Sequence, residues 1–218
     1  MTHDLPPALA HMQPDWTDPG DFRAVTVASV LTTRECDRIV AAFRAIEATG
    51  QATMRDGDAA RVLLLHLGGV TGWAGRQDWP DLLFPPGLDG IAPTLNETMR
   101  MWAGALWGLD LFPGFMLLPM FRVDADGPSL GSEWRVDYRA DPGSGAFCCK
   151  ATGIVQLSDP ASYDGGDIET FTGRRTIDGG RERGSLTLFP SIALHRRRPI
   201  TRGERFLMMI AACGPPFR

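Results

Sequence analysis

The second half of this chain is a succession of short segments with the composition of β-strands. They cover residues 115–123, 132–138, 146–158, 167–171, 185–190 and 205–213. Clusters of glycine, aspartate and proline separate them, and 25 Gly and 17 Pro among 218 residues supply the turns that such a chain needs. Many short strands at this spacing are typical of an all-β sandwich, a barrel or a jelly roll.

Two helices are expected before these strands. The sequence Thr-Thr-Arg-Glu at 32–35 has the form of a capping box, and Gly50 is placed to end the helix that follows. The apolar positions of this helix are Ile39, Val40, Phe43 and Ile46. Those of the second helix are Ile91, Leu95, Met99, Trp102 and Leu106. Both sets recur every three to four residues, which predicts one buried face each and an α+β fold with the helices packed on one sheet.

The length and composition fit a single globular domain with an N-terminal extension. Residues 1–22 contain four prolines and are predicted to form an extended lead-in. A net charge of −4 gives no general reason to expect a nucleic acid as the partner. The longest apolar run, at 114–121, has eight residues, which is too short to span a membrane.

Cysteine usage and the N-terminal sequence both favour a cytoplasmic location. The four cysteines, Cys36, Cys148, Cys149 and Cys213, have no C-x-x-C spacing, so we interpret them as reduced thiols of the core. The first residues contain no basic region followed by an apolar segment, which a secretory signal would require.

Residues able to carry chemistry gather near the end of the chain. His195 is the only histidine of the second half and follows a predicted strand and turn. Arg205 comes ten residues later, where the last predicted strand begins. The segment Tyr-Asp-Gly-Gly-Asp at 163–167 forms a turn upstream, because Asp-Gly and Gly-Gly favour tight hairpins.

Taken together, the segments 157–168, 184–190 and 195–205 resemble the Fe(II)/2-oxoglutarate-dependent dioxygenases, and within them the bacterial prolyl-4-hydroxylase-like (PKHD-type) branch. The resemblance covers about residues 115–213. It implies a double-stranded β-helix (jelly roll) over that segment, preceded by a helical layer, within a single domain at 23–218.

The resemblance also implies a specific site. Two histidines and a carboxylate hold Fe(II) in such proteins, and a buried cation binds the distal carboxylate of 2-oxoglutarate. His195 would be the second histidine ligand, Asp137 the carboxylate ligand and Arg205 the residue that binds the cosubstrate. Ascorbate is a further cofactor that the resemblance allows.

Arg135 stands where the first histidine ligand should be, since the expected H-x-D sequence is here Arg-Val-Asp. A guanidinium stays protonated and has no lone pair for a metal. Two outcomes are open: Arg135 pairs with Asp137 or Glu133 and fills the metal position, or it turns outward while iron binds through Asp137, His195, water and Glu133. His66 is an outside candidate for the missing imidazole. Phe121 is a second departure, because many relatives have a tyrosine there.

The function implied is an oxygenase of the hydroxylase type, which hydroxylates a C–H bond of a small-molecule or peptidyl substrate while 2-oxoglutarate is oxidatively decarboxylated. One alternative is a non-catalytic member that keeps the pocket as a binding module, which Arg135 favours. A second alternative is an anion- or nucleic-acid-binding β-barrel that uses the arginines between Arg196 and Arg205. The net charge favours instead a solvated rim balanced by acidic neighbours.

Overall fold

A computed structural model describes residues 24–48, 53–54, 60–65, 90–112, 116–124, 133–138, 148–171 and 176–216. The predicted lead-in at 1–22, the helix-ending Gly50 and the candidate ligand His66 lie outside these residues. So does the side chain of Phe121, whose backbone alone is described.

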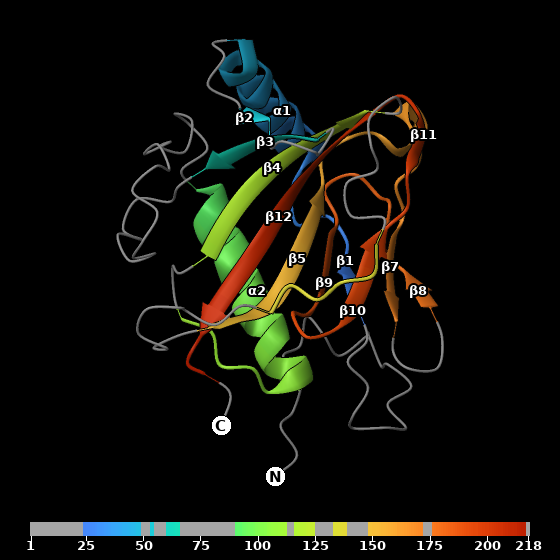
Figure 1. The fold of residues 1–218 in the computed structure, drawn as a ribbon. Helices are drawn as coiled ribbons and strands as arrows, with labels where there is room; N and C mark the ends of the chain where they lie inside the picture. Colours follow the sequence, from blue (N-terminus) through green and yellow to red (C-terminus); the bar gives the residue numbers. More distant parts are fainter. Residues whose placement is uncertain are drawn as a thin grey trace.

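The largest element is an antiparallel sheet of seven strands (Figure 1). Its order is β1 (Val25–Val27), β9 (Leu186–Pro190), β5 (Cys148–Gln156), β12 (Glu204–Gly214), β4 (Met116–Asp124), β3 (Ala60–Leu65) and β2 (Thr53–Met54). A three-stranded sheet has the order β10 (Leu194–Arg197), β7 (Ile168–Phe171) and β8 (Thr176–Asp178). A two-stranded sheet pairs β11 (Ile200–Arg202) with β6 (Asp164–Gly165), and a short 3₁₀ helix covers Pro160–Ser162.

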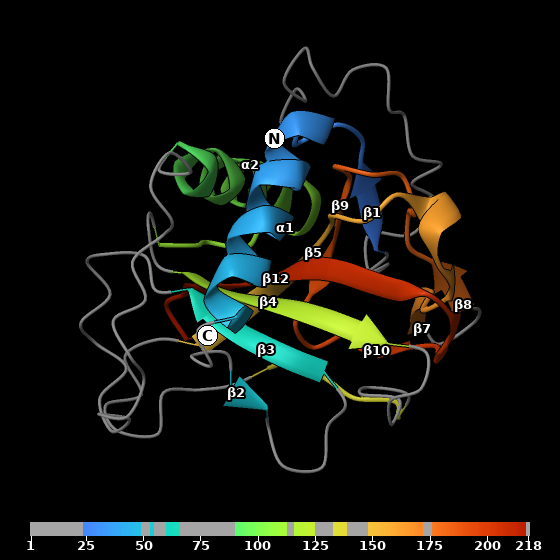
Figure 2. The same cartoon turned by 90° about the horizontal axis from the view of Figure 1, so that it is seen from above.

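Two helices, α1 (Thr33–Ala48) and α2 (Ile91–Trp107), lie on one face of the seven-stranded sheet (Figure 2). The predicted capping box is confirmed at the start of α1. The amide of Glu35 donates to the Thr32 hydroxyl at 3.2 Å, and the amide of Thr32 donates to the Glu35 carboxylate at 2.7 Å. These contacts satisfy amide groups that the first helical turn leaves free, and they lower the pKa of Glu35.

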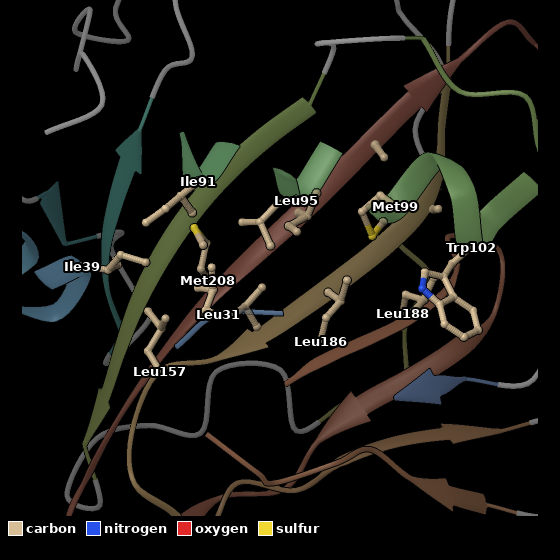
Figure 3. Close-up of a cluster of buried hydrophobic side chains, with 14 of the residues drawn as sticks. Leu31, Ile39, Ile91, Leu95, Met99, Trp102, Leu157, Leu186, Leu188 and Met208 are labelled. Atoms are coloured by element: carbon tan, nitrogen blue, oxygen red, sulfur yellow. The ribbon is translucent and has the colours of Figure 1, made fainter. Parts of the chain in front are cut away.

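The main core lies between these helices and the sheet (Figure 3). The helices contribute the predicted apolar positions to it, including Ile39, Phe43, Ile91, Leu95, Met99 and Trp102. The sheet contributes alternate residues of its strands, including Ala151, Val155, Leu186, Leu188, Phe206 and Met208. Because side chains alternate along a strand, the residues between these point to the opposite face of the sheet.

That opposite face packs toward the three-stranded sheet and forms a second, smaller cluster. Its members are Ile154, Ile168, Phe189, Ala193 and Leu207. β12 carries Arg205, Leu207 and Met209 on this side, and β5 carries Thr152, Ile154 and Gln156. The space between the two sheets is therefore where β12 brings Arg205 and where β10 brings His195.

Most predicted strands are confirmed within one or two residues, but residues 132–138 do not form one. In this segment Arg135 makes a single isolated bridge to His195. The amides of Asp137 and Tyr138 then both donate to the carbonyl of Ser191, which turns the chain away from a continuous ladder. The pairs β6–β11 and β7–β10 were not predicted as pairs, because sequence alone does not reveal which short strands meet.

All four cysteines are buried and free, which agrees with their interpretation as reduced core thiols. The Sγ atoms of Cys149 and Cys213 lie 3.1 Å apart across β5 and β12. The contact with Cys149 and burial both raise the pKa of Cys213. Among the helices of the described residues, none has the length and hydropathy needed to cross a membrane.

Candidate functional site

The structure brings His195 and Asp137 into direct contact. Nε2 of His195 lies 3.2 Å from Oδ2 of Asp137, and the imidazole is only 2% exposed. The hydroxyl of Thr152 on β5 donates to the same carboxylate oxygen at 3.1 Å. The ring of Phe189 packs at 4.7 Å from the imidazole. Two side chains of the seven-stranded sheet, from β5 and β9, thus contact the pair.

The backbone explains why residues 135, 137 and 195 share one face. Arg135 and His195 exchange both amide-to-carbonyl hydrogen bonds, each 2.9 Å long, so they are directly opposed cross-strand neighbours. Side chains at opposed positions lie on the same side. Asp137 comes two residues after Arg135, and the 3.2 Å contact of its carboxylate with Nε2 of His195 places it on that side as well.

The arrangement of His195 and Asp137 can be tested against Fe(II), the ion that the resemblance implies. Nδ1 of His195 lies 3.1 Å from the carbonyl oxygen of Ala193, which assigns the imidazole proton to Nδ1. In the neutral imidazole Nε2 then carries the lone pair; it is buried and faces Oδ2 of Asp137 at 3.2 Å, with no aligned hydrogen bond to any described residue. A metal-bound histidine is oriented in the same way, through a hydrogen bond from its other nitrogen.

Asp137 supplies the second donor in its ionised form. Burial acts to raise the pKa of Asp137, but the contacts with His195, Arg135 and Thr152 together hold it below its ordinary value. A carboxylate and an imidazole lone pair that face each other are stabilised by a cation between them. These two residues therefore fit Fe(II).

The third expected donor is absent, since Arg135 occupies its position. Nε of Arg135 lies 3.6 Å from Oδ1 of Asp137, which is an ion-pair distance but too long for a hydrogen bond. The Arg135 side chain is 42% exposed, and its guanidinium has no lone pair to donate to a metal. Glu133 is exposed. Among the described residues, no cluster of three or more His, Cys, Asp or Glu could hold a metal.

A small hollow of about 40 Å³ opens beside His195, between the two sheets. Its apolar wall comes from Ile154, Ile168, Leu207 and Met209. Its polar rim comes from Arg135, His195, Arg196 and Arg197. The site is thus an apolar pocket with a basic rim and one imidazole on its wall.

Arg205 lies two residues before Leu207 on the same strand and is 1% exposed, but it does not line the hollow. Its Nε donates to Oε1 of Gln156 at 3.1 Å, Nη2 donates to the same oxygen, and Nη1 donates to the carbonyl of Gly166. Its guanidinium lies 5.2 Å from the centre of the Tyr163 ring. Burial lowers the pKa of Arg205, although a guanidinium remains protonated in proteins.

Three buried groups at Arg205 keep unused hydrogen-bonding capacity. The hydrogen bonds of the guanidinium to Gln156 and Gly166 use three of its five N–H groups. The hydroxyl of Tyr163 and Nε2 of Gln156 are buried and have no hydrogen-bond partner among the described residues. Buried polar groups are almost always hydrogen-bonded in folded proteins, so this combination indicates a place for a polar ligand.

The other arginines of the 196–205 segment are largely held by carboxylates. Nε of Arg196 donates to Glu169 at 2.5 Å, and Arg198 donates to the other oxygen of that carboxylate at 2.6 Å. Glu169 is 1% exposed, and these partners hold its pKa below its ordinary value. Arg202 donates to Asp164 at 2.6 Å. This pairing does not favour a nucleic-acid surface, which would present unneutralised arginines.

Gly166 limits the space around Arg205, which gives a first prediction. A Cβ atom at Gly166 would meet the Ile200 side chain and lie 3.0 Å from Nη1 of Arg205. We expect Gly166→Ala to displace the guanidinium and to weaken 2-oxoglutarate binding by at least about tenfold. Gly108→Ala is the matched control, because Gly108 also has a positive φ of 62° but nothing lies within 4 Å of its Cβ position. Equal 2-oxoglutarate affinity of the two variants in a binding titration would contradict this role of Gly166.

Sequence reasoning identified Asp137, His195 and Arg205 but missed their supporting residues. Thr152 and Gln156 hold Asp137 and Arg205 from one face of β5, four residues apart. Their sequence signal is weak, because with Lys150 they are the three polar residues of a strand that is otherwise apolar. Tyr163 was interpreted as part of a structural turn, whereas its buried ring also contacts Arg205.

Comparison with curated proteins finds bacterial relatives. The chain is 30% identical over 169 residues to the PKHD-type hydroxylase YbiX of Shigella dysenteriae, which covers 76% of this chain and 69% of that protein. It is 33% identical over 129 residues to a PKHD-type hydroxylase of Teredinibacter turnerae, with 57% and 56% covered. The matched segments span about half the length of most of these curated relatives. No family model matches the chain.

Comparison with solved structures agrees at the level of the fold. A prolyl-4-hydroxylase of Pseudomonas putida superposes with a TM-score of 0.62 over 87% of this chain and 91% of its own, at 15% identity. At that identity the likeness concerns the fold alone.

Proposed function

We propose that this chain, which belongs to the PKHD-type hydroxylase family, is an Fe(II)- and 2-oxoglutarate-dependent oxygenase that hydroxylates a C–H bond. The observation that carries this proposal is the buried Nε2 of His195, which faces the ionised carboxylate of Asp137 at 3.2 Å. An imidazole oriented through Nδ1 and a carboxylate beside it are two of the three donors that such a site uses.

His195 and Asp137 would hold the iron, and their neighbours would fix their positions. The carbonyl of Ala193 keeps the imidazole proton on Nδ1, and the Thr152 hydroxyl orients the carboxylate. Bound Fe(II) would supply the activation of O₂. The overall reaction consumes one O₂, one 2-oxoglutarate and one C–H group and yields succinate, CO₂ and a C–OH group.

Arg205 would bind the distal carboxylate of 2-oxoglutarate with the N–H groups that Gln156 and Gly166 leave free. The Tyr163 hydroxyl and Nε2 of Gln156 are further donors at the same place. Ile154 and Leu207, between this end and His195, would exclude water from the cosubstrate. Low local polarity strengthens the charge-assisted hydrogen bonds that hold it.

We also propose that residues 23–218 form one domain and that the two facing sheets are those of a double-stranded β-helix. Antiparallel pairing throughout the described strands supports this interpretation. The structural likeness to prolyl hydroxylases over most of the chain supports it as well.

A non-catalytic binding module is the second candidate, and Arg135 is the observation that favours it. With only two protein donors, iron binds less tightly, and a member of the family could keep the pocket without the chemistry. A measurement of turnover distinguishes an enzyme from a binding module, whereas a measurement of metal content does not.

The test is consumption of 2-oxoglutarate with stoichiometric formation of succinate, measured with Fe(II) and O₂ and with chelator added in parallel. We expect iron-dependent succinate formation that His195→Ala abolishes while the variant remains folded by circular dichroism. Succinate formation that survives in His195→Ala would contradict the assignment of His195 as an iron ligand. No succinate formation in a folded wild-type protein saturated with Fe(II) would leave only the binding module.

A further inference from the structure

Outside the candidate iron site, the structure brings two buried thiols into direct contact. Cys149 on β5 and Cys213 on β12 are directly opposed neighbours in adjacent strands (Figure 1). Their Sγ atoms lie 3.1 Å apart, and the two residues are 3% and 0% exposed. With Ala211 they form a small cluster of their own, separate from both larger apolar clusters. The proposed oxygenase function uses neither thiol.

The backbone geometry of this pair permits a disulfide. Opposed residues of an antiparallel pair have Cα atoms about 4.5 to 5.5 Å apart, and a disulfide accepts Cα separations of about 4.4 to 6.8 Å. The two sulfur atoms would approach each other by about 1 Å, because a disulfide bond is about 2.05 Å long. A cross-strand bond therefore requires a local adjustment of β5 and β12 and no unpairing of the sheet.

A buried serine, Ser191, links this pair to the proposed iron ligand Asp137. Its hydroxyl donates to the carbonyl of Cys149 at 2.5 Å, and its amide donates to the carbonyl of Lys150 at 2.8 Å. Its own carbonyl accepts the amides of Asp137 and Tyr138, at 2.9 and 3.0 Å. The position of the Asp137 backbone thus depends on the position of β5 beside Cys149.

β5 is also irregular at the thiol pair. Its register against β12 shifts there by one residue, and Lys150 is the extra residue of a β-bulge. A bulge interrupts the ladder and bends the strand locally. Farther along β5, the Thr152 hydroxyl donates to the Asp137 carboxylate at 3.1 Å. A change in the course of β5 at the bulge therefore reaches Asp137 through two contacts, one with Ser191 and one with Thr152.

We propose that Cys149 and Cys213 form a reversible disulfide when hydrogen peroxide reaches them, and that this disulfide displaces Asp137 from His195. The Cys149 sulfur attacks one oxygen of the peroxide, the O–O bond breaks, and a sulfenic acid forms with release of one water. The Cys213 sulfur then attacks the Cys149 sulfur, and the second oxygen leaves as water. The two thiols lose two protons and two electrons in all, and one hydrogen peroxide is reduced to two molecules of water.

The surroundings of the two sulfurs determine the order of these steps. The contact with Cys149 raises the pKa of Cys213, so Cys213 keeps its proton and Cys149 is the sulfur that reacts first. Burial of both thiols slows the reaction, and it favours a small oxidant such as hydrogen peroxide over a bulky one such as oxidised glutathione.

The consequence for iron rests on the proposed function, whereas the disulfide itself does not. A metal or catalytic site requires its groups within about 0.5 Å of their working positions. A sulfur approach of about 1 Å at Cys149, passed on through Ser191, is large enough to move Asp137 relative to His195. Loss of a residue that orients a metal ligand lowers affinity about 10- to 100-fold, so we expect oxidation to weaken Fe(II) binding by at least about tenfold.

The experiment treats the full, metal-free chain in EDTA with hydrogen peroxide and analyses it by mass spectrometry with peptide mapping. We expect each chain to lose two hydrogen atoms through a cross-link between Cys149 and Cys213, and to regain them in dithiothreitol. Cys213→Ala should not lose them. Cys148→Ala is the matched control, because it removes an equally buried neighbouring thiol and leaves the pair intact.

Two measurements on the oxidised chain, after the peroxide has been removed, test the link to the site. The imidazole NMR signals of His195, assigned by their absence in His195→Ala, should shift on oxidation without any metal present and return on reduction. The Fe(II) affinity of the oxidised wild type should fall by at least about tenfold, and that of peroxide-treated Cys213→Ala should not change.

No cross-link in a folded wild-type protein, or a cross-link between other cysteines, would overturn the proposal. A disulfide between Cys149 and Cys213 that leaves the His195 signals or a measurable Fe(II) affinity unchanged would overturn it as well. A disulfide that shifts the His195 signals in a chain that binds no Fe(II) in either state would instead contradict the proposed function and leave this inference standing.

Discussion

Replacing Arg135 with histidine is expected to tighten Fe(II) binding by at least about a hundredfold. Removing a residue that only orients a metal ligand already lowers metal affinity about 10- to 100-fold, and a missing ligand should matter more. Position 135 is directly opposed to His195 through two 2.9 Å backbone hydrogen bonds, so an imidazole there would share the face of His195 and Asp137. The substitution both adds a lone pair and removes a positive charge. Anaerobic Fe(II) titration of the two proteins measures the change.

Arg135→Gln separates these two effects. It removes the charge but adds no good metal ligand, so we expect a gain well below that of Arg135→His. If both variants gain equally, repulsion by the guanidinium rather than the missing ligand limits iron binding. If neither gains, residues 135, 137 and 195 do not form one metal site.

Substitution of Arg205 is expected to have the second large effect, on 2-oxoglutarate. Arg205→Gln should weaken 2-oxoglutarate binding by at least about a hundredfold, because a carboxylate loses its buried cationic partner. The guanidinium of Arg205 is 1% exposed and contacts Gln156 and Gly166, and no other described cation takes its place there. The distal carboxylate of 2-oxoglutarate would therefore have no cationic partner in the variant. Calorimetric titration with 2-oxoglutarate in the presence of anaerobic Fe(II) checks this expectation.

Arg202→Gln provides the matched control for Arg205, three residues earlier and exposed, where it pairs with Asp164. It should bind 2-oxoglutarate as the wild type does. Arg205→Lys keeps the charge without the planar fork and should lie between the two. Thermal unfolding of each variant shows whether it is folded. A folded Arg205→Gln protein with unchanged 2-oxoglutarate affinity would contradict the assignment of Arg205.

Periodicity predicted the helices and most strands because each signal is local. The capping box at Thr32 and Glu35 needs contacts only three residues apart, and the apolar spacing of α2 gives its buried face directly. Pairing is not local: β1 joins the sheet through β9, about 160 residues away in sequence. Residues 132–138 were expected to form a strand, but the amides of Asp137 and Tyr138 both donate to the carbonyl of Ser191 instead of pairing along a ladder.

Asp137, His195 and Arg205 were predicted as site residues from the resemblance to a known family. Asp137 and His195 lie in contact, as expected. Arg205 lies at the start of the last strand, but the sequence could not predict that it does not line the hollow. Thr152, Gln156 and Glu169 could not be inferred, because their partners come from other strands. Arg135 was predicted either to fill the metal position or to turn outward; the structure combines a loose ion pair with an exposed side chain.

The iron and 2-oxoglutarate site is tested most directly by an anaerobic titration of the wild-type protein with Fe(II) and 2-oxoglutarate, followed through the visible metal-to-ligand charge-transfer band. We expect a band that requires both additions and that His195→Ala and Arg205→Gln each weaken. No band in a folded, iron-saturated protein, or a band of full strength in both variants, would contradict the assignment of His195, Asp137 and Arg205 to one iron and 2-oxoglutarate site.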